Sequence, residues 1–213
     1  MSSQNHVVER ALRRGARSSD RHEDRAAEAA RRVVAHAAEE GLADVVYAPV
    51  ESPFGDLLLA ATGRGLLRVA FPEEDADSVL DRISRRVSPR IVEAPAGLER
   101  ARRELDEYFA GSRRRFDLTL DWSLVGGPFG RKVLHVTSEI PYGGVLSYRE
   151  VATDAGSPRG SRAAGNALGS NPIPIVVPCH RVLHSGGGLG GYGGGLDRKR
   201  WLLELEGALT PRL

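Results

Sequence analysis

The chain has 213 residues, 41% of them hydrophobic, which is enough to bury a core in one large domain or two small ones. Because no apolar run approaches the ~20 residues of a membrane-spanning helix and the N-terminus is polar, we expect a cytoplasmic protein that does not enter a membrane. The single cysteine excludes an internal disulfide and a zinc site made of several thiolates, while a net charge of +2 gives only weak support for a nucleic-acid partner.

Residues 7–40 are rich in Arg, Ala and Glu, with Val33, Val34 and Ala37 at helical spacing before Gly41. This pattern predicts one or two surface helices within an N-terminal extension, residues 1–44. Such a run of charges is typical of a solvated face, and a surface dedicated to a partner is the alternative.

Short β-prone runs separated by turn residues begin at Val45. They predict an antiparallel meander, followed by two amphipathic helices and a closing strand. The expected strands are 45–50, 57–61, 66–70 and 116–120, and the expected helices are 75–87 and 98–109. Together these elements predict a small α/β domain over residues 45–122.

A link rich in glycine and proline at 123–130 indicates that a second domain begins there and occupies residues 123–213. This domain is expected to be mainly helical, and it contains ten basic and six acidic residues from position 131 onward. The expected helices are 131–140, 147–155, one beginning at Pro158, and 197–206.

The two middle helices form a helix-turn-helix pattern. Ser147 is the expected N-cap of the first, with Glu150 completing a capping box. Ser157 is the expected N-cap of the second, with Pro158 in its first position, where a missing N–H is harmless. DNA binding is one interpretation of this pattern, but many helical hairpins bind nothing.

The most informative stretch runs from residue 171 to residue 182. Its three prolines fix their own φ and favour extended geometry before them, so they predict a stiff arm that presents Cys179. A nucleophilic cysteine needs a base and a cationic neighbour, and His180 and Arg181 follow directly. Consecutive side chains in extended chain point to opposite faces, so the alternative is that Cys179 is a small buried hydrophobe and His180 a core histidine.

A glycine-rich loop, residues 186–195, follows this arm. Glycines of this density let the backbone approach a ligand closely, although a mobile surface loop has the same composition. A phosphate cradle is not expected, because no Gly-Lys-Ser/Thr sequence follows.

The chain contains, in order, Ser-Tyr-Arg-Glu-Val-Ala from Ser147, Gly-Asn-Ala-Leu-Gly-Ser-Asn-Pro-Ile-Pro-Ile-Val-Val-Pro-Cys-His-Arg-Val from Gly165, and Lys-Arg-Trp-Leu-Leu-Glu-Leu-Glu-Gly from Lys199. These runs resemble the catalytic domain of the O6-alkylguanine-DNA alkyltransferases, also called methylated-DNA–protein-cysteine methyltransferases. Residues 47–120 resemble, more weakly, the family's N-terminal domain. The resemblance implies a two-domain α/β (α+β) fold, with a small ribonuclease-H-like domain and a helical, winged helix-turn-helix-type catalytic domain.

The resemblance also implies a chemistry, the single-turnover transfer of an alkyl group from guanine to the protein. It makes Cys179 the acceptor, His180 a base reached through a water molecule, and Glu206 the carboxylate that orients His180. Asn171 would brace the turn around the cysteine. Tyr148 would donate a hydrogen bond to guanine N3, where negative charge develops as the alkyl group leaves.

Further residues are implied in DNA and base binding: Ser147, Arg162, Gly165, Val182, Tyr192 and Gly193. Arg162 would fill the space left when the nucleotide rotates out of the duplex, on a helix that the family inserts into the minor groove. The carbonyls of Cys179 and Val182 would accept from the exocyclic amine, the N–H of Gly193 would point to O6, and Tyr192 would form a wall of the pocket. The implied partner is double-stranded DNA with O6-alkylguanine, with O4-alkylthymine as a second candidate, bound by a monomer.

Two alternatives have other functions. A binding module of the alkyltransferase-like kind lacks the acceptor cysteine, so Cys179 argues against it. A cysteine hydrolase or acyltransferase that uses Cys179 and His180 would turn over, whereas a thioether has no route to hydrolysis. A sensor with a cysteine-rich zinc module cannot be built from one cysteine, and we expect neither a metal nor a cofactor.

Overall fold

The computed structural model describes residues 43–210 of the chain. The helices predicted within residues 7–40 lie outside the described residues. Within 43–210, no helix is both long and apolar enough to cross a membrane.

A four-stranded sheet forms the N-terminal part, with strand order β3-β2-β1-β4. The strands are β1 (Val45–Val50), β2 (Leu57–Thr62), β3 (Gly65–Ala70) and β4 (Ile91–Glu93). The first three form the predicted antiparallel meander, in which Val45 pairs with Thr62 and Leu58 with Ala70. β4 was not predicted, and it pairs parallel to β1.

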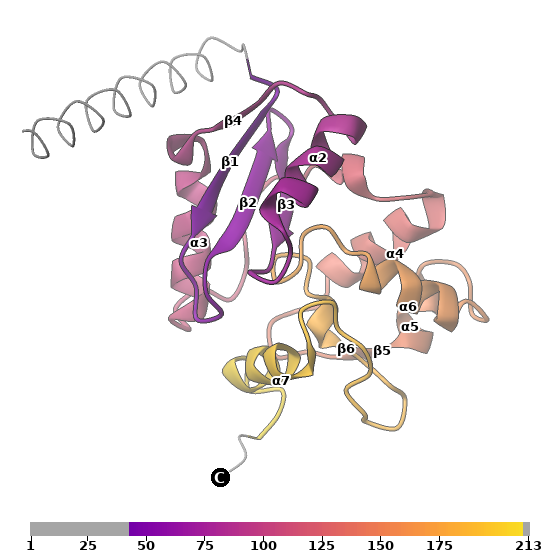
Figure 1. Ribbon diagram of the computed structural model, residues 1–213. Coiled ribbons are helices and arrows are strands. Elements are labelled where there is room, and N and C mark those ends of the chain that lie inside the picture. The colour runs from indigo at the N-terminus through magenta and orange to yellow at the C-terminus, as the bar shows by residue number, and fades with distance from the viewer. Residues whose placement is uncertain (1–42, 211–213) are drawn as a thin grey trace, which may run out of the picture.

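Two helices cover the opposite faces of this sheet, α2 (Ala76–Arg86) and α3 (Glu99–Phe109), close to their predicted ranges (Figure 1). Asp75 caps α2 by accepting from the backbone N–H of Ser78 at 2.9 Å. Val79 and Ile83 of α2 pack on one hydrophobic cluster of the sheet, whereas α3 contributes to a second. The alternation of strand side chains thus supplies an apolar layer to each face.

The strand predicted at 116–120 is wrong. Its apolar residues are half-buried and the polar residues between them are exposed, but the described backbone forms only an isolated parallel bridge between Leu66 and Leu120. Thr119 accepts from the N–H of Leu66 at 2.9 Å, and Leu66 accepts from the N–H of Asp121 at 2.8 Å. The alternation reports which side chains face the core, and it does not guarantee a ladder of backbone hydrogen bonds.

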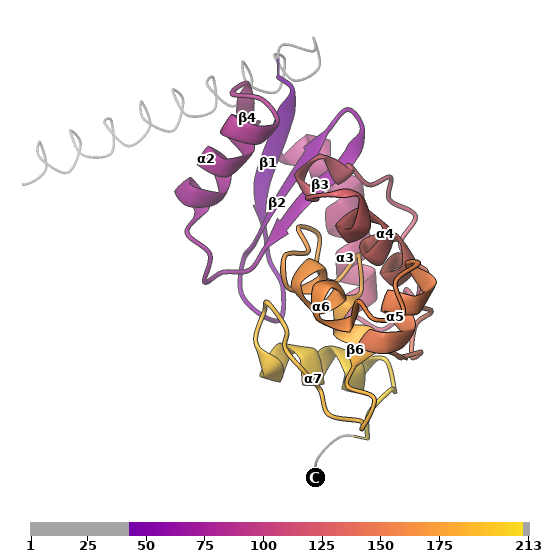
Figure 2. The same cartoon turned by 90° about the vertical axis from the view of Figure 1, so that its right-hand side faces the viewer.

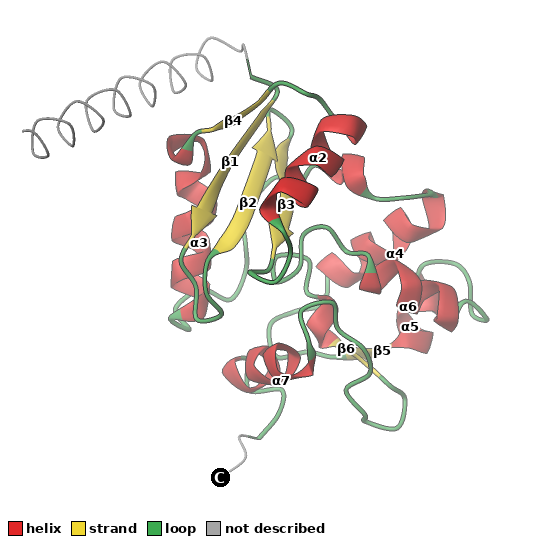
Figure 3. Ribbon diagram, viewed as in Figure 1, coloured by secondary structure: helices red, strands yellow, loops and turns green. Residues whose placement is uncertain are grey.

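The C-terminal part is mainly helical, with one small two-stranded parallel sheet (Figures 2 and 3). Its elements are α4 (Pro128–Ser138), β5 (Leu146–Ser147), α5 (Tyr148–Asp154), α6 (Ser161–Gly169), β6 (Val182–Leu183) and α7 (Leu196–Leu205). Ser147 and Glu150 form the predicted capping box of α5. α4 starts three residues earlier than predicted, because Pro128 takes the first helical turn, where proline is tolerated.

The predicted start of α6 is also wrong. Ser157 does not cap this helix; instead its carbonyl accepts from the N–H of Gly160 at 2.8 Å and closes a turn through Pro158. The helix begins at Ser161, with Gly160 as an N-cap that makes no side-chain hydrogen bond. Proline is favoured both in the second position of a turn and in the first turn of a helix. The local sequence around Pro158 therefore does not distinguish a turn from a helix start.

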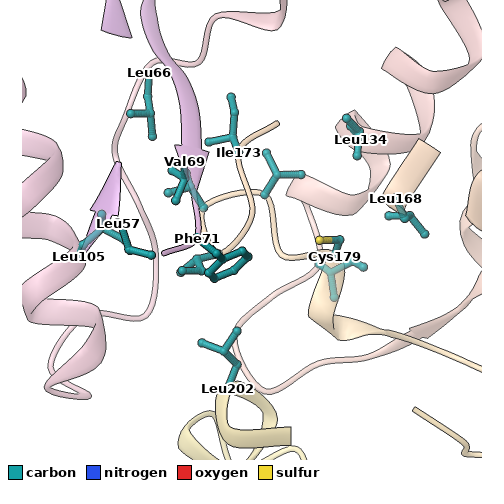
Figure 4. Close-up of a cluster of buried hydrophobic side chains, with 14 of the residues drawn as sticks. Leu57, Leu66, Val69, Phe71, Leu105, Leu134, Leu168, Ile173, Cys179 and Leu202 are labelled. Atoms are coloured by element: carbon teal, nitrogen blue, oxygen red, sulfur yellow. The ribbon is translucent and has the colours of Figure 1, made fainter. Parts of the chain in front are cut away.

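The two parts of the chain share a hydrophobic core. One cluster of buried side chains joins Leu57 and Val69 of the sheet and Leu105 of α3 to Ile173 and Leu202 of the C-terminal part (Figure 4). The segment that carries the cysteine is therefore packed directly against the N-terminal sheet.

Candidate active site

Cys179 begins a short 3-10 turn, Cys179–Arg181, at the end of the proline-rich arm. Every residue from 171 to 182 is buried, so the arm is a core segment and not an exposed one. The carbonyl of Pro172 accepts from the N–H of Val69 in β3 at 2.9 Å, which ties the arm to the sheet. Ile175 has a φ of 73°, the sole positive value for a non-glycine residue within 43–210, so the surrounding packing holds the arm in a strained conformation.

Asn171 connects the two ends of this arm. Its Nδ2 donates to the carbonyl of Val177 at 2.9 Å and to Sγ of Cys179 at 3.2 Å, while its Oδ1 accepts from the N–H of Ile173 at 3.0 Å. The side chain therefore makes the bracing contacts that the resemblance implied. A hydrogen bond to sulfur also favours the thiolate over the thiol.

Glu206, at the C-terminal end of α7, is the centre of a buried polar network. Its Oε1 lies 2.9 Å from Nε2 of His180 and accepts from the hydroxyl of Tyr108 at 2.6 Å. Arg181 donates through Nε to Oε2 at 2.9 Å and through Nη2 to Oε1 at 2.8 Å. This bidentate pair neutralises both charges inside the protein, as a buried ion pair requires.

These contacts determine the resting protonation states. Burial opposes ionisation of Glu206, but hydrogen bonds from His180 and Arg181 outweigh it and lower its pKa to about 2. Burial lowers the pKa of His180, and the opposing effect of Glu206 is the smaller one. A neutral His180 beside an ionised carboxylate must donate from Nε2, so Nδ1 is left as the acceptor. Nδ1 is buried and has no hydrogen-bond partner among the described residues.

Cys179 is a neutral thiol in this arrangement. Burial raises its pKa to about 11, while the hydrogen bond from Asn171 and the charge of Lys199 oppose the increase. Arg181, two residues after Cys179, binds Glu206 instead of lying against the sulfur. The thiol therefore needs a base before it can act as a nucleophile.

Lys199 is fully buried on α7 and holds the glycine-rich loop to the reactive turn. Its Nζ donates to the carbonyls of Val182 at 2.6 Å and Gly191 at 3.3 Å, and also to that of Leu189. Burial lowers its pKa to about 8, and the nearby Cys179 opposes this effect. The lysine is thus the cation whose charge favours the thiolate.

A cavity of about 610 Å³ opens beside the cysteine. Its walls include Tyr148, Gly165, Cys179, Tyr192 and Gly193, and Arg162 lies exposed at the start of α6, which also lines it. This volume lies within the range of about 300–1,000 Å³ that is common for small-molecule sites. The structure therefore brings most of the expected base-binding residues around one opening.

Some expected contacts have other partners in this structure. The hydroxyl of Tyr148 donates to the carbonyl of Gly191 at 3.3 Å, and the side chain of Ser147 accepts from the N–H of Glu150. Ser147 is not among the residues that line the cavity. The carbonyl of Val182 already accepts from Lys199, and Val182 is also not among the residues that line the cavity.

Sequence reasoning missed Tyr108 and Lys199, and it left open whether Arg181 contacts Cys179; the structure pairs Arg181 with Glu206. Tyr108 lies 98 positions before its partner Glu206, so spacing could not reveal the contact. Lys199 lies within the charged run Asp-Arg-Lys-Arg at 197–200, so the local sequence does not single it out as the buried member.

Comparison with known proteins identifies the chain. The model of the "6-O-methylguanine DNA methyltransferase, ribonuclease-like domain" matches residues 45–122, and that of the corresponding DNA binding domain matches residues 128–208. A methylated-DNA–protein-cysteine methyltransferase of Methanosarcina acetivorans is 41% identical over 162 residues, which are 76% of this chain and 98% of the relative. The chain belongs to the methylated-DNA–protein-cysteine methyltransferase family.

Other members of this methyltransferase family agree. The constitutive enzyme of Bacillus subtilis is 36% identical, over 75% of this chain and 94% of the relative. The crystal structure of the Mycobacterium tuberculosis enzyme OGT in complex with DNA has a TM-score of 0.66 at 41% identity and covers 76% of this chain and 92% of that one. The family resemblance and the predicted fold class are confirmed. The family's activity is DNA repair by transfer of an alkyl group to a cysteine of the protein, and Cys179 is the single cysteine of this sequence.

Proposed function

We propose that Cys179 removes the alkyl group from O6-alkylguanine in double-stranded DNA, once per protein molecule. The observation that carries the proposal is the position of Cys179 at the wall of a 610 Å³ cavity, directly followed by a histidine that a buried carboxylate orients. A cysteine packed only against hydrocarbon would have neither feature. Each protein molecule is consumed in the reaction, because the thioether product has no leaving group that water can displace.

The first step is proton transfer from the thiol. His180 Nδ1 is the acceptor, through a bridging water, because Nε2 is committed to Glu206. The imidazolium that forms is stabilised by the ionised Glu206, which is why the carboxylate must remain charged. Arg181 and Tyr108 hold Glu206 in place through the transfer.

The second step is in-line displacement at the alkyl carbon. The thiolate forms the S–C bond as the C–O6 bond breaks, and the electron pair of that bond passes to the purine. Tyr148 leaves its hydrogen bond to Gly191 and donates to guanine N3, so that charge on the leaving base is stabilised. The N–H of Gly193 donates to O6, and the carbonyls of Cys179 and Val182 accept from the exocyclic amine.

An alkylated oxygen inside a base stack cannot be reached in line, so the nucleotide rotates into the cavity. α6 enters the minor groove, and the exposed Arg162 at its start replaces the rotated nucleotide in the stack. Gly165, on the same helix, keeps the facing surface small. We place this reaction in the cytoplasm, with a monomer as the active species and O4-alkylthymine as a second substrate.

Transfer is tested with duplex DNA that contains O6-methylguanine. The peptide that bears Cys179 should gain one methyl group, and product should stop at one equivalent per protein. An unmodified peptide or continued turnover would overturn the proposal, and turnover would favour a cysteine hydrolase.

The role of Arg162 is tested with Arg162→Ala. We expect a larger loss of rate on duplex DNA than on free O6-methylguanine, because the free base needs no rotation. Arg103→Ala, an exposed arginine of α3, is the matched control. Equal losses on both substrates would remove the stacking role.

A further inference from the structure

A second cavity, of about 490 Å³, lies between residues 114–120 of the N-terminal part and residues 138–142 at the end of α4 and beyond it. Its volume is also within the range that is common for small-molecule sites. It shares no lining residue with the 610 Å³ cavity beside Cys179. Its apolar walls include Phe116, Leu118, Leu120, Ile140 and Val176.

Cations gather at this cavity. Arg114 and Arg115 line it, both are exposed, and neither has a carboxylate partner within residues 43–210. Arg113, which precedes them, is by contrast paired with Glu107 at 2.7 Å. Glu139 is the one acidic residue among the lining residues. Two unpaired arginines against one glutamate leave a positive excess of one charge at the cavity.

Arg181 also lines the cavity, although its residue is only 6% exposed. A guanidinium has five N–H donors. Three of those of Arg181 have acceptors, because Nε and Nη2 donate to Glu206 and Nη1 donates to the carbonyl of Ile140. The two remaining N–H groups have no acceptor among the described residues. A ligand oxygen at this wall can accept from them.

These features favour one class of ligand. Arginine pairs with a carboxylate through parallel N–H···O bonds, and an apolar body is stabilised by burial against Phe116 and Leu118. The ring of Tyr142 holds the guanidinium of Arg114 at the cavity, 5.7 Å from the ring centroid. An inorganic anion would leave the apolar walls in water, and a neutral apolar molecule would leave the arginines unpaired.

We propose that this cavity binds a small organic carboxylate with an apolar body, and that the bound carboxylate speeds thiolate formation at Cys179. The second part rests on the proposed function and adds a means of regulation to it. Arg181 carries the effect, because it lines the cavity and also holds Glu206. Glu206 in turn orients His180, so the ligand acts on the reactive network without entering the cavity that receives the base.

The direction of the effect follows from the charges. Burial is the main cause that lowers the pKa of His180, and the charge of Arg181 adds to the lowering. A carboxylate beside Arg181 compensates this charge, so that His180 accepts the thiol proton more readily. The negative charge opposes the thiolate less, because Arg181 contacts Glu206 and not the sulfur. The ligand itself exchanges no atom with the protein.

Binding is tested by isothermal titration of the full-length protein with 4-phenylbutyrate and with its neutral isostere, 4-phenylbutanamide. We expect tighter binding of the acid, and a carboxylate-to-amide affinity ratio about fivefold lower in Arg114→Gln/Arg115→Gln, since two exposed charges are removed. Arg82→Gln is the matched control, because Arg82 is exposed on α2 and lines a different cavity. Equal affinity for acid and amide in the wild type, or an equal fall of the ratio in the control, overturns the site.

The link to Cys179 is tested by alkylation with iodoacetamide, which reports on the single cysteine of the chain. With saturating 4-phenylbutyrate we expect the wild type to react about threefold faster, since half a pKa unit changes the thiolate fraction by that factor. The amide should leave the rate unchanged. An unchanged or lower rate with the bound acid overturns the link.

Failure of the proposed function gives a different result. In that case 4-phenylbutyrate would bind and alkylation by iodoacetamide would become faster, but no methyl group would pass from O6-methylguanine in duplex DNA to Cys179. The two failures are therefore distinguishable.

Discussion

Replacement of Glu206 by glutamine tests the buried network most directly. The ionised carboxylate is held by Tyr108, His180 and Arg181, and its pKa falls from 4.5 to about 2. A lowering of this size corresponds to about 3 kcal/mol of stabilisation at neutral pH. Removal of one partner from a buried ion pair typically costs about 3–5 kcal/mol, which agrees with this value. We therefore expect Glu206→Gln to lower the free energy of unfolding by about 3 kcal/mol.

The assay is urea denaturation followed by tryptophan fluorescence, with Glu139→Gln as an exposed control at the end of α4. The pKa of Glu206 is depressed in the folded state, so its contribution is present above pH 4.5 and is lost as the pH falls towards 2. The stability difference between wild type and variant should shrink over that window. A difference at neutral pH no larger than the roughly 0.5 kcal/mol of a surface substitution would refute the reasoning.

Two further predictions concern the sulfur and the glycine-rich loop. Asn171→Ala removes the hydrogen bond to Sγ of Cys179, so we expect the pKa of the thiol to rise. Alkylation of the thiol by iodoacetamide should then be about tenfold slower at fixed pH. An unchanged pH–rate profile of this alkylation would contradict the prediction. A Cβ at Gly194 would lie 2.6 Å from Cε2 of Phe71, whereas one at Gly193 would meet its nearest neighbour at 3.7 Å. Gly194→Ala should therefore lower the free energy of unfolding by about 1–3 kcal/mol, measured by thermal unfolding, and Gly193→Ala should lower it much less. Equal losses of stability in the two variants would show that the ring of Phe71 moves aside.

The elements that the sequence predicts well are those with local causes. The capping box at Ser147 and Glu150 needs only four residues, and the meander at 45–70 needs only alternation and turns. Both are found as predicted. The site residues near Cys179 in sequence, Asn171 and His180, also lie around it in the fold, because a short arm rich in proline leaves few conformations.

The features that the sequence does not predict depend on distant partners. The three-residue β4 is too short to show a period, and it forms because β1 offers an unpaired edge. The sequence leaves open whether Arg181 contacts the thiol, and Glu206, 25 residues away, binds it instead. Lys199 finds carbonyl partners at Val182 in β6 and at Gly191 in a loop whose glycine composition carries no structural pattern. In each case the stabilising contact joins segments that local rules treat separately.

The shared core has a consequence for how this protein can be divided. The family models separate the chain between residues 122 and 128, yet the hydrophobic cluster around Leu59, Val69 and Ile173 runs across that boundary. A fragment that begins at residue 128 would expose this apolar surface to water and would lose the strand that holds Pro172. We therefore expect the two parts, which the family models match separately, to unfold as one cooperative unit, and chemistry at the sulfur depends on a sheet that contributes no reacting atom.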